Sequence, residues 1–246
     1  MRGVDDFMID YLMTIYRTYD LLDIQIENFE KKFSESEYRL IVVDNTPNSE
    51  KKEIKNKDKI DLIVDLDSSV TFDGVSHGGA LDVGLNYCES PIVCILDSDF
   101  FFLKNITNYI KEKFSLGYEA VGSSWDDGLG TRPWVKRFPD RYNNIPCAFG
   151  AFYNLELAKS NSWIVTREDV ANGQSTGFIE TGWRIRKHIL DNSIKTFSWK
   201  TKSNGYGNCF FEDENQNMVG MHYVGGSHVR WNENTQSEIK SIIGSY

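Results

Sequence analysis

The 246-residue sequence lacks several features that would assign it to a common class of protein. It contains no run of about 20 apolar residues, which is the length that a membrane-spanning helix needs. Its net charge is −9 and no basic stripe is visible, which argues against a nucleic-acid partner held by phosphate attraction. The first residues are acidic and mixed, without the basic and then apolar pattern of a signal peptide. We therefore expect a cytoplasmic protein without a membrane span.

Paired cysteines and known phosphate-binding loops are also missing. The four cysteines show no CxxC spacing, so reduced structural thiols are the simplest account of them. The sequence has neither a GxGxxG fingerprint nor a GxxxxGK loop, so any bound phosphate must be held in another way. The cysteines are Cys88, Cys94, Cys147 and Cys209.

The first half of the chain alternates short apolar runs with segments of helical spacing. Strands that alternate with helices imply right-handed crossovers and a parallel sheet, so we expect an α/β fold. The expected strands are 11–16, 39–43, 60–66 and 92–96, and the expected helices are 19–33, 51–59 and 78–89.

The second half is less regular and contains a long segment rich in Gly, Pro, Arg and aromatic residues, from 125 to 144. Such composition is typical of a functional loop. No internal repeat or clean linker is visible, so we expect one domain over residues 1–246, with two functional halves at about 8–105 and 106–246. The expected elements are a helix at 107–115, a strand at 120–123, a strand running into a helix at 148–159, a helix at 179–190, a Gly-rich segment at 219–231 and a short helix after 232.

The most informative segment is an apolar run that ends in two carboxylates. Residues 92–96 are rich in β-branched side chains, as in a buried strand, and Asp97, Ser98 and Asp99 follow at once. Ligands sit beyond the carboxyl ends of strands in open α/β sheets, so both acids should face a site. A divalent ion that also binds phosphate would offset the cost of two adjacent carboxylates. The plainer interpretation is a turn or a helix N-cap after a core strand.

Six short motifs follow one another along the chain: Tyr11–Arg17, Ile41–Asn45, Ser76–Leu85, Leu96–Asp99, Phe149–Phe152 and Ile179–Trp183. Taken in order, they resemble those of family 2 glycosyltransferases with the GT-A fold. The resemblance covers most of the chain, from about residue 11 to residue 231. The third motif has Asp82 where the family usually has Asn, and the sixth has Thr181 where the family often has a second acid.

The resemblance implies a mostly parallel central sheet flanked by helices, with a nucleotide-binding half and an acceptor half. It implies a hexosyltransferase-like enzyme that moves a sugar from a nucleotide-diphosphate sugar to an acceptor hydroxyl, with inversion at the anomeric carbon. Uridine donors are the commonest in the family, so UDP is the first expectation for the nucleotide, and the acceptor is a carbohydrate or another hydroxyl compound. The implied donor-binding residues are Thr14, Tyr16, Arg17, Asp44, His77, Asp82, Asp97, Ser98, Asp99 and Arg230.

The resemblance also implies a divalent metal, Mn²⁺ or Mg²⁺, held by Asp97 and Asp99. Many GT-A enzymes take a third ligand from a histidine near the C-terminus, and His222 is the first choice here, with His228 as the alternative. Imidazole and carboxylates both suit manganese-like ions.

An acceptor hydroxyl is a weak nucleophile that needs a general base within hydrogen-bond reach. Glu180 is our candidate, and its plainer interpretation is an acid in the first turn of a helix. Asp126 and Asp127 are alternatives for the base. Trp125, Asp126 and Trp134 are our candidates for the acceptor site, because aromatic faces suit sugar rings.

Three other interpretations compete with a glycosyltransferase. A catalytically weak carbohydrate- or nucleotide-sugar-binding protein on the same fold is favoured by Thr181 in place of the second acid. A phosphatase of the haloacid-dehalogenase type also places Asp-x-Asp after a strand, but there the motif usually opens the domain. A nucleotidyltransferase would carry a Gly- and Lys-rich N-terminal loop, which is missing.

Overall fold

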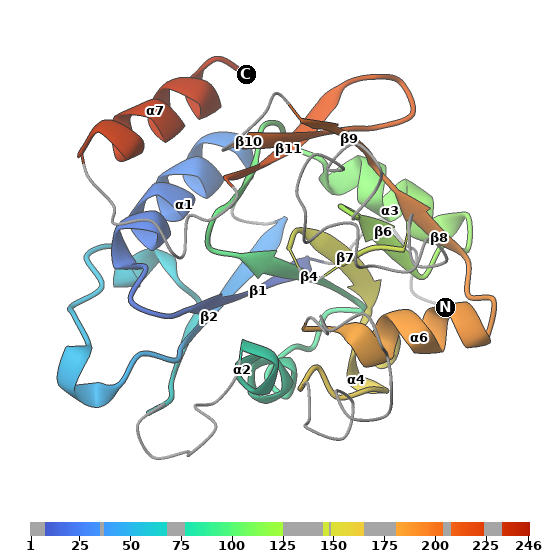
Figure 1. The fold of residues 1–246 in the computed structure, drawn as a ribbon, viewed down its shortest axis with the longest axis horizontal. Helices are drawn as coiled ribbons and strands as arrows, with labels where there is room; N and C mark the ends of the chain where they lie inside the picture. Colours follow the sequence, from blue (N-terminus) through green and yellow to red (C-terminus); the bar gives the residue numbers. More distant parts are fainter. Residues whose placement is uncertain are drawn as a thin grey trace.

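The computed structural model describes residues 8–34, 37–67, 77–124, 145–147, 149–164, 181–203, 208–223 and 233–246. Within them the chain forms two sheets and six α-helices (Figure 1). The helices are α1 (Tyr19–Lys32), α2 (His77–Leu85), α3 (Thr107–Ser115), α4 (Leu155–Lys159), α6 (Trp183–Asp191) and α7 (Glu233–Gly244).

The larger sheet has seven strands in the order β3-β2-β1-β4-β7-β6-β8. All neighbouring pairs are parallel except those of β7, which is antiparallel to β4 and to β6. The mostly parallel α/β sheet expected from the sequence is therefore confirmed. Its strands are β1 (Ile9–Ile15), β2 (Tyr38–Asp44), β3 (Leu62–Asp65), β4 (Ile92–Asp97), β6 (Ala120–Gly122), β7 (Ala151–Asn154) and β8 (Thr196–Ser198).

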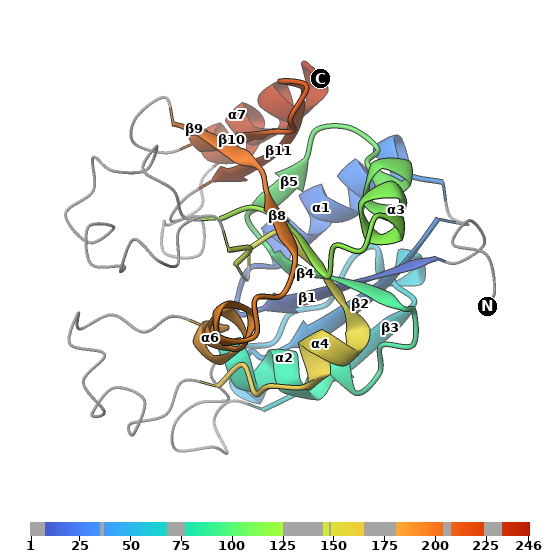
Figure 2. The same ribbon diagram turned by 90° about the vertical axis from the view of Figure 1, so that its right-hand side faces the viewer.

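A smaller antiparallel sheet of four strands, in the order β5-β11-β10-β9, lies above the larger one in Figure 2. The sequence did not predict this sheet. Three of its strands come from the last fifth of the chain, and β5 comes directly after β4. The strands are β5 (Phe100–Phe102), β9 (Lys200–Ser203), β10 (Asn208–Glu212) and β11 (Met218–Tyr223).

The two faces of the larger sheet are both covered, which explains why its central strands are apolar at nearly every position. Helices α2, α4 and α6 cover one face, and α1, α3 and the smaller sheet cover the other (Figures 1 and 2). Along β1, Tyr11 and Met13 enter one apolar cluster, and Leu12 between them enters the other. A third cluster joins α1, the smaller sheet and α7.

Aromatic rings fill the space between α1 and the two sheets. The ring of Tyr11 makes edge contacts with Phe29, Phe102 and Phe152, at centroid distances of 4.9, 5.8 and 5.7 Å. Edge-to-face contacts of this kind add to the free energy gained by burial. They fix β5 against β1 and α1, and β5 begins one residue after Asp99.

The prediction of a helix over residues 51–59 is wrong. This stretch carries only a 3₁₀ turn, Lys57–Lys59, with another at Asn48–Glu50. Ile54 is its one apolar side chain and packs against the core, so the stretch has no apolar stripe that a helix could bury. Among the described residues, the other expected helices and strands lie within a few residues of their observed bounds, and the start of the expected Gly-rich segment at 219–231 is instead strand β11.

All four cysteines are buried and none is in a disulfide, as the sequence predicted. Among the described residues, none of the helices combines the length and the apolar character that crossing a bilayer requires.

Candidate functional site

Three potential metal ligands meet where the two sheets join. Asp97 is the last residue of β4, Asp99 lies between β4 and β5, and His222 lies on β11. One ligand atom from each of the three lies within 4.8 Å of the others, and Nε2 of His222 is 3.1 Å from Oδ1 of Asp99. The sequence separation of Asp99 and His222 is 123 residues, so the fold creates this cluster.

The register of β5 and β11 brings His222 to the two acids. Phe100, the residue after Asp99, is the cross-strand partner of His222. The backbone N–H of Tyr223 donates to the carbonyl of Asp99 over 2.8 Å. The chain thus leaves the larger sheet at Asp97 and enters the smaller one at Phe100, and the turn between them carries both carboxylates.

Phe149 holds the imidazole of His222 from one side. The two rings are stacked, with centroids 4.7 Å apart and planes 14° apart. Phe149 is buried and precedes β7, so the stacking ties His222 to the larger sheet as well. No periodic pattern in the sequence marks Phe149 as a partner of His222.

The ring of Phe100 occupies a slot that two glycines leave open. A Cβ at Gly220 would lie 2.4 Å from Cζ of Phe100, and one at Gly150 would lie 2.6 Å from the same ring. Gly150 also has φ +97°, a conformation that favours glycine. The absent side chains let β5 and β11 approach closely beneath the cluster.

Burial raises the pKa of the Asp97 carboxyl, and the negative charge of nearby Asp99 raises it further. His77 opposes both effects, because its Nε2 lies 3.3 Å from Oδ1 of Asp97. That same oxygen is buried and accepts no hydrogen bond from the part of the chain that the structure describes. A buried carboxylate oxygen with spare acceptor capacity, a second acid and an imidazole are donors that suit a manganese-like divalent ion. The residues therefore fit the metal that the sequence predicted.

Residues predicted to bind the donor lie at the neighbouring strand ends. Thr14 of β1 is the cross-strand partner of Asp97, and Tyr16 and Arg17 follow the end of β1. Tyr16 is 47 % exposed, and the Arg17 guanidinium carbon lies 4.7 Å from the centre of its ring. Arg17 has φ +63°, and its backbone N–H donates to Oγ1 of Thr46 over 2.9 Å. A non-glycine residue in this conformation is a feature often found at functional sites.

Asp44 ends β2 and is buried beside this loop. Its Oδ2 accepts a hydrogen bond from the Tyr19 hydroxyl (2.8 Å), and its Oδ1 accepts one from the backbone N–H of Thr46 (3.0 Å). These bonds shape the loops after β1 and β2. Contact between Asp44 and a nucleotide base stays a prediction.

Asp82 of α2 binds the segment after α4. Its Oδ1 accepts from the backbone N–H of Trp163 over 2.8 Å, and its Oδ2 accepts from the hydroxyl of Ser162 over 2.6 Å. The carboxylate thus joins two elements on one face of the larger sheet, and its part in donor binding stays a prediction.

No protein-family model matches the sequence, and no curated protein matches it. Solved structures match the fold. The mannosyltransferase PcManGT from Pyrobaculum calidifontis, in complex with GDP-Man and Mn²⁺, gives a TM-score of 0.54 at 14 % identity, covering 77 % of this chain and 54 % of its own. The galactosyltransferase LgtC, in complex with donor and acceptor sugar analogues, gives 0.54 at 13 % identity, covering 76 % of this chain and 72 % of its own. S. aureus TarS 1-349 in complex with UDP-GlcNAc gives 0.50 at 15 % identity, covering 97 % of this chain and 66 % of its own.

This chain has the GT-A fold. It spans about half the length of the mannosyltransferase chain. The three matches are between 13 % and 15 % identical to this chain, so the likeness concerns the fold. The GT-A architecture that the sequence predicted is confirmed, and the three potential metal ligands lie at the junction of its two sheets.

Several predicted site residues of the GT-A domain lie outside the described residues, and their roles stay predictions. The candidate base, the acceptor residues and the alternative histidine are among them. They are Glu180, Trp125, Asp126, Asp127, Trp134, His228 and Arg230.

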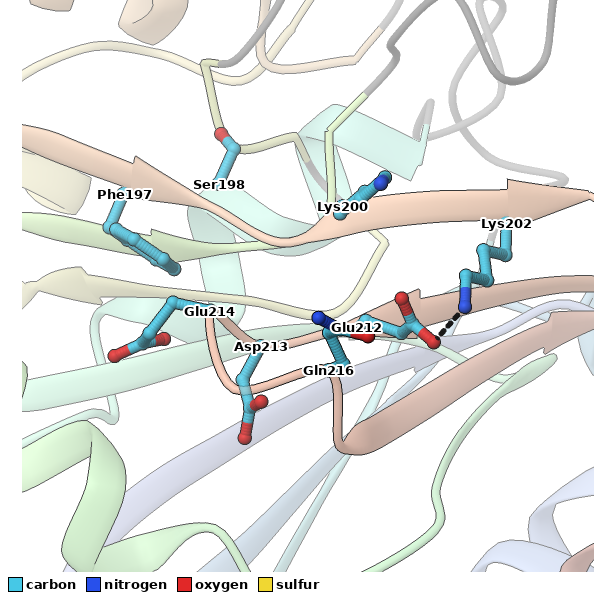
Figure 3. Close-up of a pocket in the computed structure, with 8 residues that line it drawn as sticks. All are labelled: Phe197, Ser198, Lys200, Lys202, Glu212, Asp213, Glu214 and Gln216. Carbon is cyan, nitrogen blue, oxygen red and sulfur yellow. Dashed lines mark hydrogen bonds and ion pairs between the residues drawn. The ribbon is translucent and has the colours of Figure 1, made fainter.

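A surface pocket of about 430 Å³ lies at the opposite end of the β10–β11 hairpin from His222 (Figure 3). Met218, the partner of Glu212, lies four positions before His222 on β11, which is roughly 13 Å along the strand. The acidic residues that line the pocket form ion pairs. Glu212 pairs with Lys202, and Asp213 and Glu214 pair with lysines outside the pocket. The lining of this pocket does not include Asp97, Asp99 or His222. Its lining residues are Phe197, Ser198, Lys200, Lys202, Glu212, Asp213, Glu214 and Gln216.

Proposed function

We propose that this protein is a metal-dependent glycosyltransferase that transfers a sugar from a nucleotide-diphosphate sugar to an acceptor hydroxyl, with inversion. One observation carries the proposal: Asp97, Asp99 and His222 converge beside the carboxyl ends of β1 and β4 in a GT-A fold. In open α/β sheets this is the edge at which ligands bind.

In this proposal Asp97, Asp99 and His222 hold the divalent ion, with Mn²⁺ as the first choice. When bound, the ion would offset the negative charge that develops on the leaving diphosphate. His77 stands at the N-terminal end of α2, 3.3 Å from Asp97, where its ring can contact a donor phosphate. Arg230 is the predicted further contact to the diphosphate.

The nucleoside would lie against the loops after β1 and β2. Tyr16 offers an exposed ring, and Thr14, Arg17 and Asp44 lie around the same loops. PcManGT is solved with GDP-Man and TarS with UDP-GlcNAc, so uridine and guanosine donors are the first two to test, with uridine first. Asp82 and Ser98 complete the proposed donor residues.

The acceptor hydroxyl must lose its proton as it attacks the anomeric carbon. Glu180 is the proposed base. The described helix after it, α6, begins at Trp183 with Gly182 as its N-cap. Trp125, Asp126 and Trp134 are the proposed acceptor contacts.

The test is an assay of nucleotide diphosphate release from UDP- and GDP-sugars, with Mn²⁺, Mg²⁺ or EDTA. We expect release from one donor with metal, little with EDTA, and a loss of at least 100-fold in the Asp99→Asn variant, because the remaining ligands bind the ion weakly. Donor binding without any turnover would favour the binding-protein alternative. Release that EDTA leaves unchanged would contradict the metal-dependent mechanism.

A further inference from the structure

Gln25 lies in the middle of α1, fully buried, with its amide directed at the turn that carries the metal ligands. Its Nε2 donates to the carbonyl of Ser98 over 3.3 Å and also donates to the carbonyl of Phe100. These two carbonyls flank Asp99. One side chain of α1 therefore binds the backbone on both sides of a metal ligand.

The carbonyl of Asp99 itself points the other way. It accepts from the backbone N–H of Tyr223 on β11, the residue after His222. Residues 98 and 99 form the turn between β4 and β5, and in this turn α1 holds the carbonyls of residues 98 and 100 while β11 holds the one between them. The two contacts together fix the rotation of the backbone at Asp99, and with it the direction of the carboxylate.

We propose that Gln25 is a positioning residue for the metal site, and this inference rests on the proposed function. Outer groups that orient a ligand typically change metal affinity 10- to 100-fold when they are removed. Gln25 acts through the backbone, because its amide donates to the carbonyls of Ser98 and Phe100. Its amide has one workable orientation, because the reverse would place Oε1 against two carbonyl oxygens, and a carbonyl cannot donate.

The next turn of α1 supplies a matched control. Asn28 is also buried, and its Nδ2 donates to the carbonyl of Phe102 over 3.0 Å. It makes the same kind of bond from the same helix to the same strand, but three residues beyond Asp99. Removing either side-chain amide therefore costs a buried hydrogen bond. Of the two, the Gln25 amide is the one that contacts the turn carrying the metal ligands.

The experiment compares Gln25→Met and Asn28→Leu, which remove the amide while keeping similar size. The dissociation constant for Mn²⁺ is measured from the electron paramagnetic resonance signal of the free ion, and stability is measured by urea unfolding of the metal-free protein. We expect both variants to be destabilised. Gln25→Met should bind Mn²⁺ 10- to 100-fold more weakly than wild type, and Asn28→Leu should stay within threefold.

Equal Mn²⁺ affinity in Gln25→Met and wild type, or equal losses in the two variants, would overturn the positioning role. A wild-type protein that binds no Mn²⁺ would instead overturn the proposed function, so the two failures are distinguishable. If Gln25→Met does not fold, Gln25→Asn decides: it keeps the donor one methylene further away, and wild-type affinity in it would refute the role.

Discussion

At the scale of single residues, the cluster contains a carboxylate, Asp97, whose charged form is destabilised by burial in the folded protein. Asp97 is a mostly buried carboxyl near a second acid, and its pKa is raised. A raised pKa means that the folded state favours the protonated form. The associated stability is complete below the ordinary carboxyl pKa of about 3.9 and is lost as the pH rises through the raised value. Functional sites commonly carry such a cost.

The Asp97→Asn variant should therefore be more stable than wild type when no metal is bound, by about 1 kcal/mol at pH 7. The advantage should shrink as the pH falls, because the raised pKa of Asp97 favours its protonation in the folded wild type. Urea unfolding in EDTA between pH 4 and pH 8 measures it. A variant that is less stable than wild type at pH 7 in EDTA would show that the His77 contact outweighs the burial of the charge.

Single residues also mark how far the sequence could predict the site. Asp97 and Asp99 follow an apolar strand directly, so their place at the sheet edge could be read from the local pattern. His222 needed the family resemblance. The Gln25 contacts span 73 and 75 residues, and no local pattern distinguishes this glutamine from a surface one, so its role needed the structure.

At the scale of elements, the contact between β5 and β11 sets the geometry of the cluster. It depends on the ring of Phe100, which is fully buried between Gly150 and Gly220. Because interiors are close-packed, an added methyl group there has no free space to occupy. The strands would have to separate, and His222 would move away from Asp99.

Gly220→Ala should destabilise the protein by about 1–3 kcal/mol, since the new Cβ would lie 2.4 Å from Phe100. Gly244→Ala is the matched control, because a Cβ at that end of α7 would meet no atom of the described residues within 4 Å. The control should be neutral or slightly stabilising, as alanine favours a helix. Equal unfolding midpoints in urea for Gly220→Ala and wild type would mean that the slot can widen without cost.

In the larger sheet, strands β1 to β4 were predictable because apolar runs and helical spacing alternate over residues 9–97. Its edge strand β8 was not predicted. The smaller sheet was not predicted either. Its strands β9 and β10 pair through an antiparallel register that the polar sequence of Lys200–Ser203 does not suggest, and β5 is a three-residue strand that joins β11 across more than 100 residues. For residues 51–59 the sequence predicted a helix that the structure does not have, because the prediction relied on the density of charged residues alone.

At the scale of the whole molecule, the two sheets contribute different residues to the candidate site. The larger sheet provides Asp97 and the loops after β1 and β2, and the smaller sheet brings His222 from late in the chain. The pocket of Figure 3 lies at the far end of the same hairpin and carries paired charges. Metal and donor binding should therefore depend on one end of the β10–β11 hairpin and not on the other.

The most direct test of this account measures thermal stability with UDP and GDP, each with and without Mn²⁺, in wild type, Asp99→Asn and Glu212→Gln. Both variants neutralise a buried acid: Asp99 lies beside the hairpin and pairs with His222, and Glu212 is the last residue of β10 and pairs with Lys202. Saturation at 100 times the dissociation constant should add about 2.7 kcal/mol to stability.

We predict that one nucleotide stabilises wild type and Glu212→Gln only when Mn²⁺ is present, and that Asp99→Asn loses this effect. Stabilisation that needs no metal, or that survives in Asp99→Asn, would contradict the assignment of Asp97, Asp99 and His222 as the metal site.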